Sequence, residues 1–174
     1  MVTPGLASDL HGVLKADDFN FQTVLAGVRR VGPQFSYGLG MVYSTQFGKP
    51  IPLPLLLLDW NNGGKLSWYT ILPVSSELWY AQSDKFHIGM VGGVSGNKYQ
   101  GDSKRYDVND PELQYTLVTV GPSARYAIGN ALMLHAEAGI TPYHRFEFFD
   151  GSDKQESYSL ESSAYFRFGL QLGL

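Results

Sequence analysis

Hydrophobic and polar side chains alternate through residues 157–174. The odd positions carry small, polar or charged side chains, among them Glu161, Arg167 and Gln171. Successive side chains of a β-strand point to opposite faces, so one face of this segment is apolar. An ordinary strand runs about 5 to 6 residues, whereas a strand that crosses a membrane needs about 9 to 11. The segment is therefore predicted to span a membrane, with an apolar face formed by Tyr158, Leu160, Ala164, Phe166, Phe168, Leu170, Leu172 and Leu174.

Seven earlier segments are also predicted to be strands, and turn signals separate them. Asn61-Asn-Gly-Gly64 and Gly129-Asn130 are typical of hairpin turns. Pro73 lies inside the fourth segment and requires a bulge or a free backbone N–H at that point. The alternation of the sixth segment changes phase near Gly121-Pro122, as a bulge would cause. The predicted strands cover residues 19–30, 35–47, 55–60, 66–82, 86–99, 113–128, 132–149 and 157–174.

These eight strands predict an all-β fold, a single antiparallel up-and-down transmembrane β-barrel that comprises residues 1–174. If both ends of the chain lie in the periplasm, the loops 100–112 and 150–156 fall outside the cell. The turns at 83–85 and 129–130 then fall inside, and outer-membrane barrels prefer this distribution of long and short connections. The connection 48–54 is the exception, because it is long for a periplasmic turn.

The composition favours a surface that faces lipid. Charged residues make up 17% of the chain, below the roughly 25% of soluble domains, and aromatic residues are abundant. The formal net charge of -3 and the lack of a Lys/Arg cluster argue against nucleic acid as a partner. Cysteine is absent, which excludes disulfides and thiolate chemistry. The four histidines have no metal-ligand spacing, so we expect neither a metal nor another cofactor.

The start of the chain lacks the features of a signal peptide. Met1-Val-Thr-Pro-Gly is not a basic start followed by an apolar run. The longest apolar run, residues 51–58, is short and interrupted by two prolines, so we expect no transmembrane helix. Residues 1–10 are typical of the tail of a strand whose beginning is missing. The sequence therefore suggests a fragment without its signal peptide and N-terminal strands.

Five short segments of the chain are distinctive: Phe35-Ser-Tyr-Gly-Leu-Gly, Leu53-Pro-Leu-Pro-Leu-Leu-Leu-Leu-Asp-Trp, Ile71-Leu-Pro, Gly121-Pro-Ser-Ala-Arg and Arg145-Phe-Glu-Phe-Phe-Asp-Gly. Together they resemble a domain-of-unknown-function family of Gram-negative outer-membrane proteins. The resemblance runs from about Pro4 to the end of the chain, and the family is longer at the N-terminus. It implies a barrel in the bacterial outer membrane, with lipid and the barrel insertion machinery as partners, and it implies no activity. Leu174 departs from the aromatic residue that usually ends such barrels.

The polar face indicates which side of the predicted barrel points at lipid. A soluble lipocalin-like barrel shows the same alternation inverted, with apolar side chains inside and an outer surface rich in Lys and Glu. Here the polar face consists of Gly, Ser, Gln and Thr with scattered single charges. Small residues with a few paired charges suit a narrow lumen, so we place the apolar face against lipid.

The charged residues of the polar face are predicted to pair across neighbouring strands. Folding about the turn at 129–130 sets Arg125 opposite His135. Folding about the loop 150–156 sets Arg145 opposite Glu161. A charge inside a low-dielectric barrel needs a partner, because an unpaired one costs several kcal/mol. The predicted network comprises Arg125, His135, Glu137 and Arg167 in the lumen, with Glu137 diagonal to Arg167, and Arg145 and Glu161 nearer the outer rim.

Three functions are compatible with these patterns. The first is a non-enzymatic outer-membrane barrel that serves as a small pore for solutes or as a structural or adhesive surface element. The second is an outer-membrane enzyme acting on lipid or peptide, with His135 and Glu137 as base and orienter and Ser123 or Ser163 as nucleophile. The third is a soluble barrel that binds a hydrophobic ligand. We favour the first, because any polar lumen contains residues of this kind as a salt-bridged plug.

Overall fold

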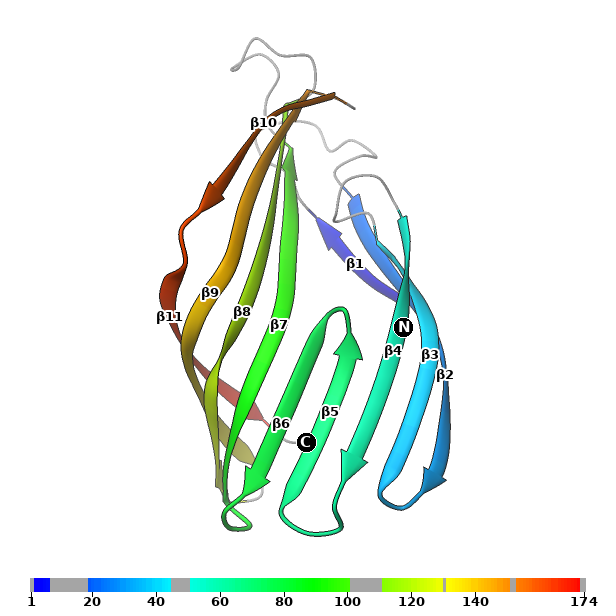
Figure 1. Ribbon diagram of the computed structural model, residues 1–174, viewed down its shortest axis with the longest axis vertical. Coiled ribbons are helices and arrows are strands. Elements are labelled where there is room, and N and C mark those ends of the chain that lie inside the picture. Colours follow the sequence, from blue (N-terminus) through cyan, green and yellow to red (C-terminus); the bar gives the residue numbers. More distant parts are fainter. Residues whose placement is uncertain are drawn as a thin grey trace.

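A computed structural model describes residues 2–6, 19–44, 51–100, 111–129, 131–150 and 153–172 of the chain, and its regular elements are strands (Figure 1). Strands β1 to β10 follow one another in the order of the sequence, and β11 pairs with β9. Within the described residues, no helix is long and apolar enough to cross a membrane. The strands are β1 (Val2–Leu6), β2 (Phe19–Gly32), β3 (Phe35–Ser44), β4 (Ile51–Asn61), β5 (Leu66–Leu72), β6 (Ser75–Ala81), β7 (Phe86–Gln100), β8 (Pro111–Ile128), β9 (Leu132–Asp150), β10 (Asp153–Leu160) and β11 (Ser163–Leu172).

The prediction of an all-β antiparallel meander is confirmed, but the number of strands differs. The predicted single strand 66–82 is instead the hairpin of β5 and β6. It turns at Pro73 and Val74, and the Val74 backbone N–H donates to the Ile71 carbonyl oxygen over 2.7 Å. Proline has no N–H to contribute to a ladder and fits a turn, so Pro73 reverses the chain here and is not a bulge within one strand.

The predicted terminal strand also differs from the observed one. It begins earlier, at Asp153, and it is interrupted at Glu161 and Ser162. Both resulting pieces, β10 and β11, pair with β9, and from Glu156 to Leu172 they keep one register with it. The eight predicted strands thus become nine consecutive positions in the sheet, of which the last is divided between β10 and β11, and β1 adds a tenth position before them.

The extra reversal at the β5–β6 hairpin changes the end of the sheet at which the earlier connections lie. The turns at 33–34, 62–65 and 82–85 and the connection between β8 and β9 all lie at one end, which we call the turn end (Figure 1). The connection 45–50, which is outside the described residues, joins strands at the opposite end, the loop end. The long connection that did not fit the predicted barrel therefore joins its strands at the same end as 101–110 and 151–152, which are also outside the described residues.

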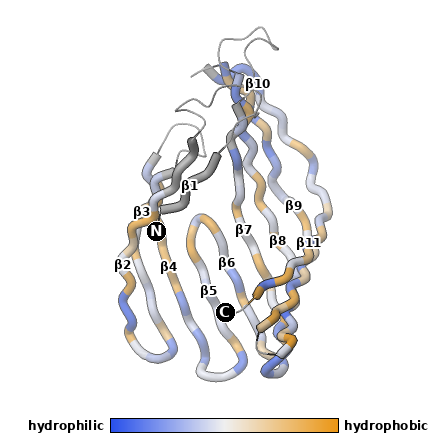
Figure 2. The backbone as a smooth tube through the Cα atoms, turned by 180° about the vertical axis from the view of Figure 1, so that it is seen from behind, coloured by the Kyte–Doolittle hydropathy of each residue, from blue (hydrophilic) through white to orange (hydrophobic). Residues whose placement is uncertain are grey.

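The sheet is strongly curved but is not closed. Among the described residues, neither β10 nor β11 pairs with β1 or β2. Strand β1 and the lower part of β11 are both drawn faint in Figure 1, so both edges lie on the far side of that view, which Figure 2 shows from behind. The sheet therefore has a concave and a convex face, and the two edge regions lie along the open side.

Contacts across the sheet identify the two faces. Arg125 of β8 reaches past β7 to Glu77 of β6, with 2.9 Å between Nη2 and Oε2. Two side chains on alternate strands meet in this way on the concave face of a curved sheet. The neighbouring register pairs Arg167 of β11 with Glu137 of β9 on that same face. The even positions of β11 lie on the convex face, where Phe166 is 73% exposed and Leu172 is 76% exposed.

A register shift in β9 exchanges the two faces between the turn end and the loop end. Val120 pairs with Ile140 but Val118 pairs with Tyr143, so β9 has one extra residue opposite Thr119. The shift lies on β9, whereas the sequence placed a bulge in β8 near Gly121. Beyond it, Phe146 of β9 packs against Tyr115 on the concave face, although Phe146 and Glu137 have opposite parity in β9.

The interruption between β10 and β11 matches the shift in β9. Tyr158 packs edge-on against Phe148, with ring centroids 6.0 Å apart, so it lies on the concave face together with the odd residues of β11. The predicted single apolar face of residues 157–174 is therefore divided: Tyr158 and Leu160 are concave, the even residues from Ala164 to Leu172 are convex, and Leu174 lies outside the described residues. A bulge adds one residue to a strand and reverses the side to which the following side chains point.

Gly139 allows close approach of β8, β9 and β11 beside this shift. A Cβ atom on Gly139 would lie 2.2 Å from the Val120 carbonyl oxygen, 2.7 Å from the Gly121 Cα and 2.9 Å from the Tyr165 Cε1. Only glycine avoids these overlaps, and the Tyr165 ring lies against the backbone that glycine leaves uncovered.

We predict that Gly139→Ala lowers the free energy of unfolding by about 1 to 3 kcal/mol. The added Cβ would overlap the β8 backbone and the Tyr165 ring, and neither can move away without disturbing the register shift of β9. The control is Gly169→Ala on the same face of β11, where a Cβ meets nothing within 4 Å. Equilibrium unfolding in urea, followed by tryptophan fluorescence, compares the two variants. Equal stability of both with the wild type would contradict the close approach.

Candidate functional site

The concave face carries a polar cluster near the turn end, which we call the concave network. It begins on β6, where the Trp79 indole Nε1–H donates to Glu77 Oε2 over 2.8 Å. The guanidinium of Arg125 binds the same carboxylate oxygen and lies over the Trp79 ring, with its Cζ 3.8 Å from the ring centroid. Trp79 is only 6% exposed, and its ring packs against Gly89 of β7. The face of the Trp79 indole and the carboxylate of Glu77 therefore both stabilise the positive charge of Arg125.

The next part of the network is a serine–histidine contact. Ser123 Oγ lies 2.7 Å from His135 Nε2 and 3.2 Å from the Ala136 carbonyl oxygen, to which it donates. His135 stands opposite Arg125 in the β8–β9 register, as expected from the sequence. Its ring centroid is 6.3 Å from that of Trp79, so the histidine connects the two halves of the network.

Glu137 is the most deeply buried charged residue among the described side chains, with 2% of its surface exposed. Its carboxylate accepts a hydrogen bond from the Tyr165 hydroxyl and lies 3.6 Å from Arg167 Nη1. His135 Nε2 is 4.0 Å from the second carboxylate oxygen. Arg167 stands directly opposite Glu137 in the register, whereas the sequence placed the two residues diagonally. A buried carboxylate is costly unless it is paired and hydrogen-bonded, and these contacts meet that need.

The structure does not bring the two rim residues of the predicted network together. Arg145 pairs with Ser159, not with Glu161, which is exposed between β10 and β11. Because of the shift in β9, Arg145 is turned away from the concave face, and its Nε lies 3.5 Å from Glu147 Oε1. The predicted set thus divides into a concave group and an arginine on the convex side of the loop end.

Hydrogen bonds at the loop end shift two pKa values. Arg145 donates to the Tyr143 hydroxyl, and this contact, with the charge of Glu147, raises the pKa of the guanidinium. The Tyr158 hydroxyl donates to Glu156, and loss of that proton beside the carboxylate is unfavourable, which raises the pKa of Tyr158. Both groups therefore keep their protons across the physiological pH range.

The geometry of the serine–histidine contact does not complete a catalytic triad. The same nitrogen, His135 Nε2, faces both Ser123 and Glu137. In a triad the carboxylate holds the other ring nitrogen, so that the first can accept the serine proton. Ser123 is also only 5% exposed. The second predicted nucleophile, Ser163, lies against Thr141 Oγ1 at 2.8 Å, away from the histidine. Among the described residues, no group of three or more metal-ligating side chains is present.

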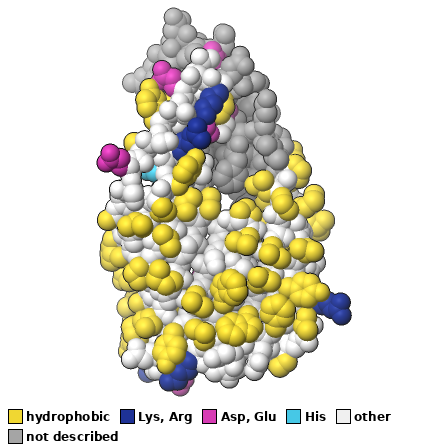
Figure 3. Space-filling view, viewed as in Figure 1, with side chains coloured by type: hydrophobic (Ala, Val, Ile, Leu, Met, Phe, Trp, Pro, Cys, Tyr) yellow, Lys and Arg dark blue, Asp and Glu magenta, His cyan; other side chains and the backbone are white. Residues whose placement is uncertain are grey.

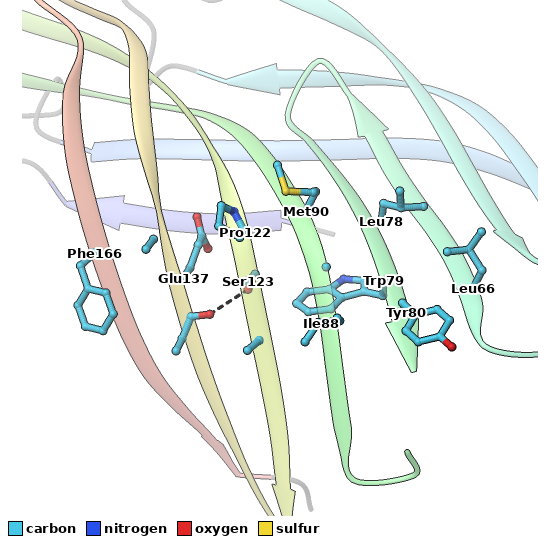
Figure 4. Close-up of a pocket in the computed structure, with 14 residues that line it drawn as sticks. Leu66, Leu78, Trp79, Tyr80, Ile88, Met90, Pro122, Ser123, Glu137 and Phe166 are labelled. Atoms are coloured by element: carbon cyan, nitrogen blue, oxygen red, sulfur yellow. Dashed lines mark hydrogen bonds between the residues drawn. The ribbon is translucent and has the colours of Figure 1, made fainter. Parts of the chain in front are cut away.

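A shallow depression of about 630 Å³ lies on the other face of the same strands (Figure 4). Its floor is formed by small residues of β8 and β9, and larger apolar side chains rise at its margins, including Phe166 on one side and Leu78 on the other (Figure 4). The depression therefore belongs to the apolar convex surface. Three residues of the concave network, Trp79, Ser123 and Glu137, also line the depression, because they belong to the strands that form its floor.

A family model matches residues 1–173, and its description is Domain of unknown function (DUF6268). The chain belongs to this family. Comparison with the curated proteins and with the solved structures found no match. The DUF6268 domain thus covers the strands that build both faces of the sheet, and the residues of the concave network all lie inside it.

Sequence reasoning missed three members of the concave network of this DUF6268 domain, Glu77, Trp79 and Tyr165. Glu77 and Trp79 lie in β6, which the sequence places in the middle of one long strand, so their register with β7 and β8 could not be predicted. The remaining signal was charge balance, because Arg125 had no carboxylate opposite it across the β8–β9 turn. The network contains two carboxylates, Glu77 and Glu137, and two guanidinium groups, Arg125 and Arg167, so the charges of these four groups balance.

We predict that Arg167→Ala lowers the free energy of unfolding by about 1 to 3 kcal/mol, because buried Glu137 loses its charged partner. The loss is moderate since the Arg167 side chain is 56% exposed and Tyr165 still donates to the carboxylate. The double variant Arg167→Ala/Glu137→Gln should recover part of the loss, because it removes the stranded charge. Urea unfolding measures all three proteins, and a single variant as stable as the wild type would show that the pair contributes nothing.

Proposed function

We propose that this chain is a non-enzymatic β-barrel of the bacterial outer membrane, whose convex face contacts lipid and whose concave face lines a polar lumen. The observation that carries the proposal is the extensive apolar surface on the convex face. Figure 3 shows many hydrophobic side chains spread over the described part of this face, among backbone and other side chains, with few charged side chains between them. Exposed apolar patches of this extent mark membrane or protein contacts.

The height of the apolar surface suits a bilayer. On β8 the convex side chains are apolar from Val118 to Ile128, and beyond Val118 toward the loop end they are Thr116, Gln114 and Glu112. On β3 the convex residues are apolar throughout 35–43. A strand that crosses the hydrocarbon obliquely needs about 9 to 11 residues, which is the length of both segments.

Residues at the two margins of this surface also support the proposal. Three aromatic side chains, Phe35, Trp60 and Trp68, are lateral neighbours on the convex face near the turn end. At the loop end, Lys154 and Arg145 both pair with Glu147 on the convex face. Aromatic rings favour the membrane interface, and charges favour water beyond it.

The proposed role follows from the distribution of polarity. Outer-membrane lipid is the partner of the convex face, and the barrel insertion machinery is the partner for assembly. The concave network fills the polar side with paired charges, which favours a plugged or narrow barrel that serves as a structural or surface element or passes only small solutes. A soluble barrel for a hydrophobic ligand calls for the opposite arrangement, with apolar side chains inside and a charged exterior.

Heat-modifiability tests the proposal directly. The chain is refolded in detergent, and boiled and unboiled samples are compared for electrophoretic migration and resistance to trypsin. A shifted, protected band in the unboiled sample is expected, because a closed barrel resists detergent until it is heated. Folding without detergent would overturn the membrane assignment.

We predict that Leu170→Arg costs about 2 to 4 kcal/mol in refolding into lipid vesicles, because it places a charge on the lipid-facing side of β11. Leu170 is 64% exposed on the convex face. The control is Gln171→Arg, which carries the same charge one residue on, toward the concave face. Unfolding from vesicles compares the two, and equal stability would place Leu170 away from lipid.

A hydrolase is the second candidate, and the contact between Ser123 and His135 is the observation that favours it. A fluorophosphonate probe, which labels activated serines, separates the two functions. Labelling that disappears in Ser123→Ala would replace our proposal with the enzyme, and no labelling is expected.

A further inference from the structure

A lateral row of basic side chains, which we call the basic row, crosses the concave face near the turn end. It is formed by His87 of β7, Arg125 of β8 and His135 of β9, which stand directly opposite one another in the two registers. The next residue in the row is Gly169 of β11, opposite His135. A Cβ atom on Gly169 would meet nothing within 4 Å, so the row ends in open space on the concave face.

The cations beside this space are more exposed than the carboxylates that they contact. Arg167, two residues from Gly169 on the same face, has a side chain that is 56% exposed, whereas the side chain of its partner Glu137 is 1% exposed. The side chains of Arg125 and Glu77 are 32% and 25% exposed. The formal charges balance, but the charge that reaches the space over β8, β9 and β11 is mainly positive.

Both guanidinium groups keep N–H donors that the network does not use. Arg125 contacts Glu77 through Nη2, and its Nε and Nη1 find no acceptor among the described residues. Arg167 approaches Glu137 through Nη1 alone. A guanidinium carries five donors in one plane and matches the oxygens of phosphate and carboxylate groups. The Trp79 ring holds the Arg125 guanidinium against its face, so the donors of Arg125 are already in position.

The first strands of the sheet do not oppose this positive charge. Arg30 of β2 and Asp59 of β4 share the concave face, because both lie in register with Ser36 of β3. Both side chains are exposed and their formal charges cancel. Within the described part of these strands, an anion at the basic row therefore meets no excess of negative charge.

We propose that the basic row and Arg167 bind a small oxyanion, the phosphate or carboxylate group of a solute in the lumen. The inference rests on the proposed barrel, whose lumen brings solutes to the concave face. The open space over Gly169 gives room for the group, the two arginines supply charged donors, and both histidines can present an N–H. Charges along low-dielectric walls raise the local concentration of ions of opposite sign. The site therefore selects anionic over cationic solutes.

A single cysteine at the end of the row tests the site, because the chain has no cysteine of its own. In Gly169→Cys the thiol enters the open space. The protein, refolded in an uncharged detergent, reacts with two methanethiosulfonates of similar size, one with a sulfonate and one with a trimethylammonium group. Relative to a free small thiol, the ratio of the anionic to the cationic rate should rise about tenfold, because the guanidinium charges attract one reagent and repel the other. A ratio equal to that of the free thiol, or below it, would overturn the site.

Removal of single charges identifies the source of the preference. Arg125→Gln and Arg167→Gln, each combined with Gly169→Cys, should bring the ratio close to that of the free thiol. The control is Arg145→Gln, on the convex side of the loop end, which should leave the ratio unchanged. The heat-modifiable band shows that each variant is folded. If both glutamine variants fold and keep the ratio of the parent protein, the two arginines do not form the site.

Protection by inorganic phosphate distinguishes binding from attraction and needs no loss of charge. Methyl methanethiosulfonate is uncharged, so its rate at position 169 reports access to the thiol. Sodium phosphate should slow this reaction with a saturating dependence on concentration, whereas sodium chloride of equal ionic strength should not. Sodium acetate in place of phosphate shows which of the two groups the site prefers. A cysteine that neither anion protects, or that does not react at all, would show that no anion enters this space and would overturn the site.

A cysteine on the convex face separates this inference from the function on which it rests. In phospholipid vesicles, Leu170→Cys should not react with either charged reagent, because lipid covers it, whereas Gly169→Cys should react. Equal reaction at both positions would overturn the membrane barrel, and the charge preference at position 169 would still stand. An unreactive position 170 combined with equal rates of the two reagents at position 169 would keep the barrel and reject the anion site.

Discussion

The extra residue of β9 opposite Thr119 decides which side chains share a face over the whole C-terminal half of the sheet. Because side chains alternate with a period of two, one added residue transfers every following side chain of that strand to the other face. β9 would lose its match with β10 and β11 unless the last strand changed phase at the same level, and it does so at Glu161 and Ser162. In this C-terminal half, the convex face of β8 and β9 is apolar near the turn end and mainly polar near the loop end.

The concave network depends on the same register. Glu137 is buried, so its charge requires partners, and these come from its own strand and from β11: His135 lies two residues away on β9, and the pairing of β9 with β11 brings Tyr165 and Arg167 to the carboxylate. The glycines of this face serve the aromatic residues, since Trp79 and Tyr165 lie against glycine backbone where a Cβ would collide with them. Glycines on the concave face therefore leave room for the Trp79 and Tyr165 rings. These two side chains in turn contact the charged groups of Arg125 and Glu137.

The fold class and much of the polar face could be predicted from the sequence, because alternation and turn signals are local. Arg125 could be placed opposite His135 since the tight turn at Gly129 fixes the register over a short distance. The hairpin at Pro73 could not be predicted from the sequence, because alternation continues on both sides of the proline and proline is compatible with either a bulge or a turn. The contact of Arg125 with Glu77 requires two successive registers across β7, and an error in strand count removes both.

The two open edges differ from the interior strands in a way that favours closure of the sheet. Convex side chains of the edge strands are more exposed, as with Leu25 at 79% on β2 and Phe166 at 73% on β11, whereas Val120 on β8 is 36% exposed. A long apolar edge with unpaired backbone groups invites pairing with any available strand. Pro52 and Pro54 discourage strand pairing at the loop end of β4. Strand β11 contains no proline, so its backbone can pair with another strand along its length. A barrel removes such edges, so the edge of β11 is the part of this sheet that most requires a partner strand.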